Sequence, residues 1–183
     1  MWQPRLFEVP ELKVNGPPGF RYKADFITPQ EEEMFLEEFR KTPLKNFQWE
    51  GYESKRRVRG FKSEFGYPEF FKPILKRVAA FAGVLPSHIK QALITEYSPG
   101  TQIGWHRDQP PYDKIIGLSF GSPVPFRLRK ISKEPARKWE RITVTAEPRS
   151  IYIMAGASRS LWQHSIPPVP DWRYSLTMRT VER

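Results

Sequence analysis

Two stretches in the first half of the chain repeat apolar residues at helical spacing. The first follows Thr28-Pro29-Gln30-Glu31, a capping box with proline at the first helical position, and predicts a helix from Pro29 to about Lys41. The second begins at residue 68 or 72 and runs to Ala82, with Gly83 as a natural C-terminal cap. Its apolar residues predict packing against a sheet.

From Gln91 onward the pattern changes to short alternating segments that are typical of strands. These segments cover about residues 91–97, 103–108, 115–120, 124–130, 141–146, 150–154, 162–166 and 173–181. Many short strands behind two N-terminal helices predict an α+β, mainly β fold with a two-sheet barrel or jelly roll as its core, at about 91–181. We expect residues 1–20, which are rich in proline, to form an extended arm, and residues 131–140 to form an exposed basic loop.

Residues 44–67 mix aromatic and basic side chains. Short strands or a hairpin with turns at Gly51 and Gly60 fit this stretch. Cations can hold phosphate while aromatic rings stack on a flipped base, so the stretch is a candidate for contact with a nucleotide. The candidate residues are Trp49, Tyr52, Arg56, Arg57 and Phe61. The alternative is that the aromatic residues belong to a core beneath a charged surface.

Composition narrows the class of protein. A length of 183 residues with 39% hydrophobic residues suits one globular domain, 1–183. The absence of cysteine excludes disulfides and thiolate metal sites. No apolar run is long enough to span a bilayer and the first twelve residues have no apolar signal core, so we expect a cytoplasmic protein without a membrane partner. We also expect a monomer, although no sequence pattern reports the oligomeric state.

The net charge of +10 is spread unevenly. Residues 1–39 carry 4 basic and 8 acidic side chains, residues 40–77 carry 11 basic and 4 acidic, and residues 127–141 carry 7 basic and 2 acidic. Two basic blocks with interleaved aromatic residues favour a polyanion partner, namely nucleic acid. A charge that only keeps the protein soluble is the alternative.

The tripeptide His106-Arg107-Asp108 and the later His164 are candidate metal ligands. An imidazole and a carboxylate two residues apart point to the same face of an extended backbone. A second imidazole from another strand would complete a set of two histidines and one carboxylate, which is typical of non-haem Fe(II) oxygenases. Because His-x-Asp is common by chance, a tripeptide without metal is the alternative.

The segment 172–180 alternates between polar and apolar residues. Arg173, Ser175, Thr177 and Arg179 share one face, and the two arginines lie roughly 20 Å apart along a strand. If this face lines a barrel, the long side chains can converge on a small dianion. Two ordinary arginines on an exposed strand are the alternative.

Taken together, these motifs resemble the AlkB family of 2-oxoglutarate- and Fe(II)-dependent dioxygenases over about residues 18–181. The family carries His-x-Asp, a distal His and then Arg-x5-Arg, and all stand here in that order. The resemblance implies a double-stranded β-helix, with about 44–67 as a nucleotide-recognition lid. It implies Fe(II) on His106, Asp108 and His164, and it implies 2-oxoglutarate on Arg173 and Tyr97, with Arg179 near the metal-side carboxylate.

Three positions depart from the family pattern. Thr95 and Ser175 stand where asparagines are usual, and each keeps a hydrogen-bond donor and acceptor near the cosubstrate. Pro110 stands where some DNA-repair members carry an acidic residue that contacts the base, which leaves base choice open. Trp105 flanks a metal ligand, so it either shapes the substrate pocket or packs around it.

The reaction that the resemblance implies is the oxidative demethylation of N-alkylated bases in DNA or RNA, as in the repair of alkylation damage. O2 and 2-oxoglutarate are consumed, and succinate, CO2 and formaldehyde are released. We expect methylated, single-stranded nucleic acid as the substrate. Three alternatives stay open. The same chemistry can act on a protein, a lipid or a modified tRNA nucleoside; the ligand set can hold zinc in a hydrolase; or the chain can be a nucleic-acid-binding module without catalysis.

Overall fold

The computed structural model describes residues 15–49, 51–132 and 138–181, with the side chains of Trp49 and Tyr52 outside that description. The strands are β1 (Phe20–Lys23), β2 (Lys45–Trp49), β3 (Tyr52–Lys62), β4 (Ile89–Tyr97), β5 (Ile103–His106), β6 (Tyr112–Gly121), β7 (Val124–Ile131), β8 (Trp139–Ala146), β9 (Ile151–Met154), β10 (Gln163–Ile166) and β11 (Arg173–Val181). The helices are α1 (Pro29–Lys41), α2 (Lys72–Ala82) and α3 (Gly156–Ser160), with 3-10 turns η1 (Ser63–Phe65), η2 (Glu69–Phe71) and η3 (Pro86–His88).

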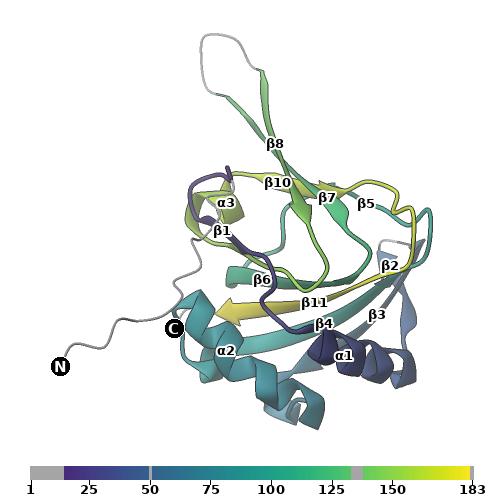
Figure 1. Cartoon of the computed structure of the whole chain (residues 1–183). Coiled ribbons are helices and arrows are strands. Elements are labelled where there is room, and N and C mark those ends of the chain that lie inside the picture. Colours follow the sequence, from purple (N-terminus) through teal and green to yellow (C-terminus); the bar gives the residue numbers. More distant parts are fainter. Residues whose placement is uncertain (1–14, 50, 133–137, 182–183) are drawn as a thin grey trace, which may run out of the picture.

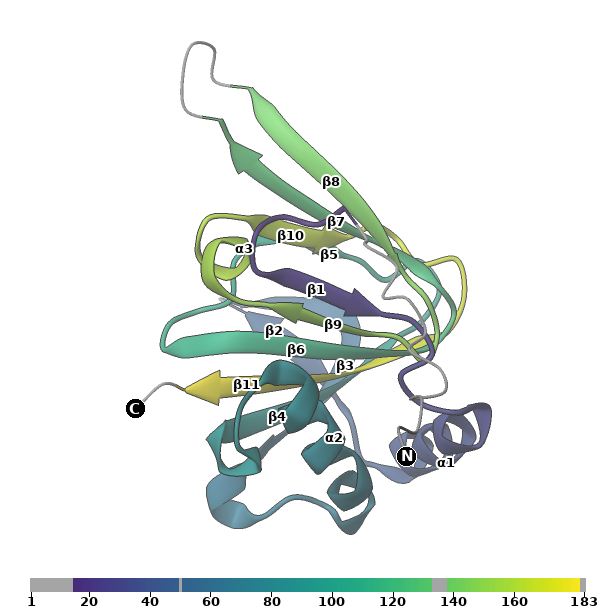
Figure 2. The same cartoon turned by 60° about the vertical axis from the view of Figure 1, so that its left-hand side comes forward.

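The strands form two antiparallel sheets that lie one above the other (Figure 1). The large sheet has the order β1-β9-β6-β11-β4-β3-β2, and the small sheet has the order β5-β10-β7-β8. Helices α1 and α2 cover the face of the large sheet that points away from the small one (Figure 2). This arrangement confirms the expected mainly β jelly roll with two N-terminal helices.

Helix α1 begins and ends where the sequence predicts. The Thr28 hydroxyl accepts from the Glu31 backbone N–H at 3.1 Å, and the Glu31 carboxylate accepts from the Thr28 N–H at 2.8 Å. This reciprocal capping satisfies donors that the first helical turn leaves free. Phe35 and Phe39, four residues apart, are buried against the large sheet.

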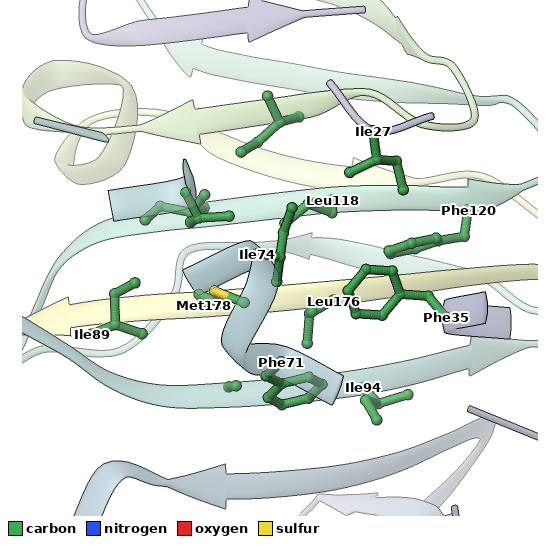
Figure 3. Close-up of a cluster of buried hydrophobic side chains, with 14 of the residues drawn as sticks. Ile27, Phe35, Phe71, Ile74, Ile89, Ile94, Leu118, Phe120, Leu176 and Met178 are labelled. Atoms are coloured by element: carbon green, nitrogen blue, oxygen red, sulfur yellow. The ribbon is translucent and has the colours of Figure 1, made fainter. Parts of the chain in front are cut away.

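Helix α2 completes the core beneath the large sheet. It ends at Gly83, whose φ of 65° is the left-handed conformation that glycine adopts without strain. Phe71 and Ile74 face Leu118, Leu176 and other apolar side chains of the sheet (Figure 3). These contacts hold the large sheet in place, so that the side chains on its other face keep fixed positions.

A second core lies between the two sheets. Tyr97, Phe126, Tyr152 and Trp162 are among its buried members. Strand β11 separates the two cores, because its apolar residues face the helices while its polar residues face the space between the sheets. The predicted alternation of segment 172–180 is therefore confirmed, and the polar face lines the barrel interior.

Strands β2 and β3 form a hairpin at the edge of the large sheet. The turn at Gly51, with φ of 81°, agrees with the prediction. The turn expected at Gly60 is wrong, because Gly60 lies inside β3 and pairs with Leu93. Strand β3 continues to Lys62 because it pairs with β4 over six consecutive residues, a long-range contact that no local pattern reports.

The remaining differences are short elements. Strand β1 and helix α3 had no expected counterpart, and β7 and β8 extend into the stretch 131–140, where a loop was expected. Residues 133–137 of that stretch, and 1–14 of the expected arm, lie outside the described residues. Within the described ranges, no helix has the length and apolar character needed to cross a membrane.

Candidate metal and cosubstrate site

Three candidate ligands converge at one end of the barrel interior. His106 ends β5, His164 lies on β10, and the two pair in register, with their ring centroids 4.2 Å apart. Asp108 follows β5 by two residues and brings a carboxylate oxygen to the same point. One ligand atom from each residue lies within 4.8 Å of the others. This set leaves several coordination positions free for other ligands.

Both imidazoles are prepared to bind a cation. Burial lowers the pKa of His164 to about 3, so this ring is neutral at pH 7 and its 3.5 Å contact with Asp108 is no ion pair. His106 Nδ1 lies 2.9 Å from the Gly104 carbonyl oxygen. Because a carbonyl only accepts, the proton sits on Nδ1, which leaves Nε2 free as a ligand.

Arg179 holds the carboxylate ligand. Its Nε and Nη2 donate to Asp108 Oδ1 at 3.3 and 3.1 Å, which leaves Oδ2 toward His164. Burial by itself raises the pKa of Asp108, but the positive charges of the imidazoles, when protonated, and of Arg179 outweigh it, and the pKa is lowered. Arg179 is positioned in turn by Gln91, which accepts from Nη1 at 3.1 Å. Asp108 is thus an oriented anion at neutral pH.

Arg173 is fully buried, with 0% of its surface exposed. Its Nε, Nη1 and Nη2 have no hydrogen-bond partner among the described residues, and its Cζ lies 4.7 Å from the centre of the Tyr97 ring. An unpaired buried guanidinium is costly unless an anion binds it. The arrangement therefore fits a small carboxylate that reaches from Arg173 toward the metal ligands.

Small and aromatic side chains lie around Arg173 and the metal ligands. Thr95 and Ser175 lie opposite each other on β4 and β11 and are buried, as expected for residues beside the cosubstrate. Tyr152, which sequence reasoning missed, also points into the interior. An added Cβ on Gly117 would lie 2.3 Å from the Tyr152 ring, so glycine makes room for this tyrosine.

The candidate substrate residues separate into several places. Arg56 comes near the metal site, whereas Arg57 turns to the opposite face of β3 and pairs with Glu96. Phe61 packs against the core beneath α2. Trp105 lies on the outer face of the small sheet. The side chains of Trp49 and Tyr52 fall outside the described part of the structure.

Comparison with known proteins assigns a class to this geometry. The model of the 2OG-Fe(II) oxygenase superfamily matches residues 19–179. The chain belongs to this superfamily, and its donor set and buried arginine fit Fe(II) and 2-oxoglutarate. It is an oxidoreductase, a 2-oxoglutarate-dependent dioxygenase, which sets the zinc-hydrolase and non-catalytic alternatives aside.

The curated relatives that the chain matches include AlkB homologues. The alkylated DNA repair protein ALKBH8 homolog of Arabidopsis thaliana is 28% identical, over 82% of this chain and 51% of the relative. The human alpha-ketoglutarate-dependent dioxygenase alkB homolog 3 is 33% identical over 92 residues, 43% of this chain and 32% of the relative. An uncharacterized protein of Acanthamoeba polyphaga mimivirus is 26% identical over 89% of this chain and 85% of its own length. This chain thus spans about half or less of the two named relatives.

Solved structures share the fold. A Pseudomonas putida prolyl-4-hydroxylase has a TM-score of 0.67 at 14% identity, covering 90% of this chain and 93% of that chain. OsALKBH1 has a TM-score of 0.65 at 15% identity, covering 90% and 99%. The fold is therefore shared by proteins with different names, and the substrate must be inferred from the residues near the metal ligands.

Proposed function

We propose that the protein oxidatively demethylates N-alkylated bases in DNA or RNA. The observation that carries this proposal is the position of Arg56 beside the metal site. Adjacent strand residues point to opposite faces, and Arg57 points to the helix side, so Arg56 shares the interior face with Tyr97 and Arg173. Its charge interacts with those of Asp108 and Arg179 at the metal site.

The surroundings of Arg56 suit a nucleotide. Its guanidinium lies 3.8 Å from the centre of the Phe47 ring, and its buried Nε has no partner among the described residues. Burial lowers the pKa of Arg56, but a guanidinium stays protonated at neutral pH. A fixed cation stacked on an aromatic ring can bind phosphate while a base enters the site.

Each residue of the site then has a role in the reaction. Fe(II) and 2-oxoglutarate, when bound, supply the oxidation of an N-methyl C–H bond by O2, after which the methyl group leaves as formaldehyde. Arg173 and Tyr97 bind and orient the far carboxylate of the cosubstrate. Arg179 keeps Asp108 turned toward the metal position, and the buried side chains around Arg173 exclude water.

A modified tRNA nucleoside is the second candidate substrate. The mouse relative, named tRNA (carboxymethyluridine(34)-5-O)-methyltransferase ALKBH8, is 30% identical over 83% of this chain but 24% of its own length. The name thus describes a much longer protein than the matched part. The same pocket and the same Arg56 would serve a nucleoside in a tRNA loop.

The test is succinate release from 2-oxoglutarate with Fe(II) and O2, combined with mass spectrometry of the nucleic acid. Single-stranded DNA and RNA with one N-methylated base are compared with the unmethylated strands and with bulk tRNA. The proposal is supported if a methylated strand stimulates succinate release and the oligonucleotide loses about 14 Da per event, the mass of the CH2 that is lost when hydrogen replaces a methyl group. Stimulation by tRNA alone, with a gain of oxygen, supports the second candidate. Succinate release that ignores every nucleic acid overturns both.

A further inference from the structure

The outer face of the small sheet carries a stack of tryptophan and arginine side chains. The Arg129 Cζ lies 4.3 Å from the centre of the Trp105 ring and 4.1 Å from that of Trp139. The Arg127 Cζ lies 5.2 Å from the Trp105 ring. We call these four residues the arginine–tryptophan ladder. It spans the sheet from β5 to β8 and takes no part in the metal site.

Two features position the ladder: the alternation of side chains along β7, and the small polar side chains of the neighbouring strand β10. Arg127 and Arg129 alternate on β7 with buried apolar residues, so both point outward. Between β5 and β7 lies β10, whose outward side chains are Ser165 and Gln163. Arg127 Nε donates to Ser165 Oγ at 3.1 Å, and Arg129 Nε donates to Gln163 Oε1 at 2.9 Å. Each guanidinium plane is therefore fixed through Nε.

The terminal nitrogens of both arginines are left for a ligand. Within the described residues, neither guanidinium has a further hydrogen bond or a carboxylate at ion-pair distance. Arg141 on β8 lies directly opposite Arg129 in the register. Like charges at opposed positions destabilise a sheet. The nearby carboxylate of Glu140 is bound by Lys130 at 3.2 Å. This face thus concentrates positive charge that no described acidic group neutralises.

The chemistry of this face fits single-stranded nucleic acid. Planar guanidinium groups with two free nitrogens match phosphate oxygens, and an exposed indole accepts a stacked base. Trp139 is 37% exposed, so its ring is open to a ligand. An acidic peptide could also pair with the arginines, but its carboxylates would not stack on the indole rings. The two features together favour a nucleic-acid strand.

The ladder also leads to the active site. Trp105 precedes the metal ligand His106 on β5 and points to the opposite face of the strand. From β8 to β5 the ladder crosses three interstrand spacings, roughly 14 Å at about 4.8 Å each. The β7–β8 hairpin extends this face beyond the body of the molecule (Figures 1 and 2). A single nucleic-acid strand bound along the ladder would reach the edge of the small sheet beside the metal ligands.

We propose that the arginine–tryptophan ladder, with Arg141, is the docking surface for the phosphate backbone of single-stranded nucleic acid on one side of the target base. This inference rests on the proposed function. It adds a second contact surface to Arg56, on the other side of the metal site. A chain anchored at both surfaces presents the base between them.

The test is the salt dependence of binding of a fluorescent single-stranded oligonucleotide, measured by anisotropy from 50 to 200 mM KCl. The variant Arg129→Gln/Arg141→Gln removes two charges from the face. The matched control Lys23→Gln/Lys76→Gln removes two exposed charges from β1 and α2. Each phosphate contact on a single strand contributes about 0.7 to the slope of log affinity against log salt, so the variant slope should fall by about 1.4. Over this range its affinity should then change about sevenfold less than that of the wild type. The control slope should match the wild type.

Three outcomes overturn the docking surface, and a different one overturns the function. An unchanged slope in the variant, equal slopes in variant and control, or displacement of the oligonucleotide by polyglutamate at equal charge each refute the surface while the demethylase stands. If the double variant unfolds, Arg141→Glu replaces it, because Arg141 is exposed and makes no described side-chain contact; its slope must then also fall. A wild type that binds no oligonucleotide and whose succinate release ignores nucleic acid refutes the proposed function itself.

Discussion

Replacing Arg173 with methionine should stabilise the ligand-free protein while removing its affinity for 2-oxoglutarate. The guanidinium is fully buried, and none of its three nitrogens has a partner among the described residues. Methionine fills similar space without charge or polar atoms. A side chain that only supports the fold would show the reverse, because its loss would lower stability.

The magnitude follows from two opposing contributions. Unsatisfied buried donors cost about 1–3 kcal/mol, and the contact with the Tyr97 ring returns about 1 kcal/mol. The variant should therefore gain up to about 2 kcal/mol, which corresponds to at most roughly 8 °C in Tm for a chain of this length. Removing one partner of a buried ion pair costs about 3–5 kcal/mol, so 2-oxoglutarate should bind more than about 100-fold weaker.

The assay is thermal unfolding with a chelator, and then with Mn(II) and increasing 2-oxoglutarate. Ligand at about 100 times its Kd should stabilise the wild type by about 2.7 kcal/mol and leave Arg173→Met unmoved. Arg57→Met is the matched contrast. It leaves the buried Glu96 carboxylate without its ion-pair partner and should therefore lower Tm. A fall in Tm for Arg173→Met, or retained protection by 2-oxoglutarate, would refute the assignment of this arginine to the cosubstrate.

Three further substitutions test other parts of the site. Arg179→Gln removes the hydrogen bonds that orient the carboxylate ligand and should weaken Mn(II) binding about 10- to 100-fold by calorimetry; equal affinity would deny it a positioning role. Gly117→Ala places a methyl group 2.3 Å from the Tyr152 ring and should cost about 1–3 kcal/mol in denaturant unfolding, a loss that Tyr152→Leu should reduce. Arg56→Gln should weaken oligonucleotide binding more than Lys55→Gln, its exposed neighbour; equal effects would mean that only net charge matters.

The pair of metal ligands His106 and Asp108 and the arginine strand could be predicted because their information is local. A spacing of two residues on an extended backbone suffices to bring the side chains of His106 and Asp108 to one face. Alternation alone places Arg173 and Arg179 on one face of β11. The helix limits were readable for the same reason, since Thr28 and Gly83 act within one turn of the helix ends. Each of these features depends on a few neighbouring residues.

The orientation of the residues on the substrate side of the site could not be predicted from residues that are adjacent in the sequence. Which of Arg56 and Arg57 enters the barrel depends on the register between β3 and β4, and a shift of one residue exchanges them. Tyr152 was missed because all four residues of β9 are buried, which hides the alternation. For Trp105 the signal was present, since a residue next to His106 on a strand must point to the other face.

The two halves of the site rest on strands of unequal strength. Strand β11 is paired on both sides, with β4 and β6, along nearly its full length, so its amide hydrogens should exchange with solvent only when the whole domain opens. Strand β5 has four residues, lies at a sheet edge and pairs with β10 through an irregular register. Release of the metal should therefore begin with fraying of β5 and withdrawal of His106, while Asp108, tied to β11 through Arg179, stays in place. The lifetime of the bound metal is then set by a local opening rate, which can be far faster than unfolding.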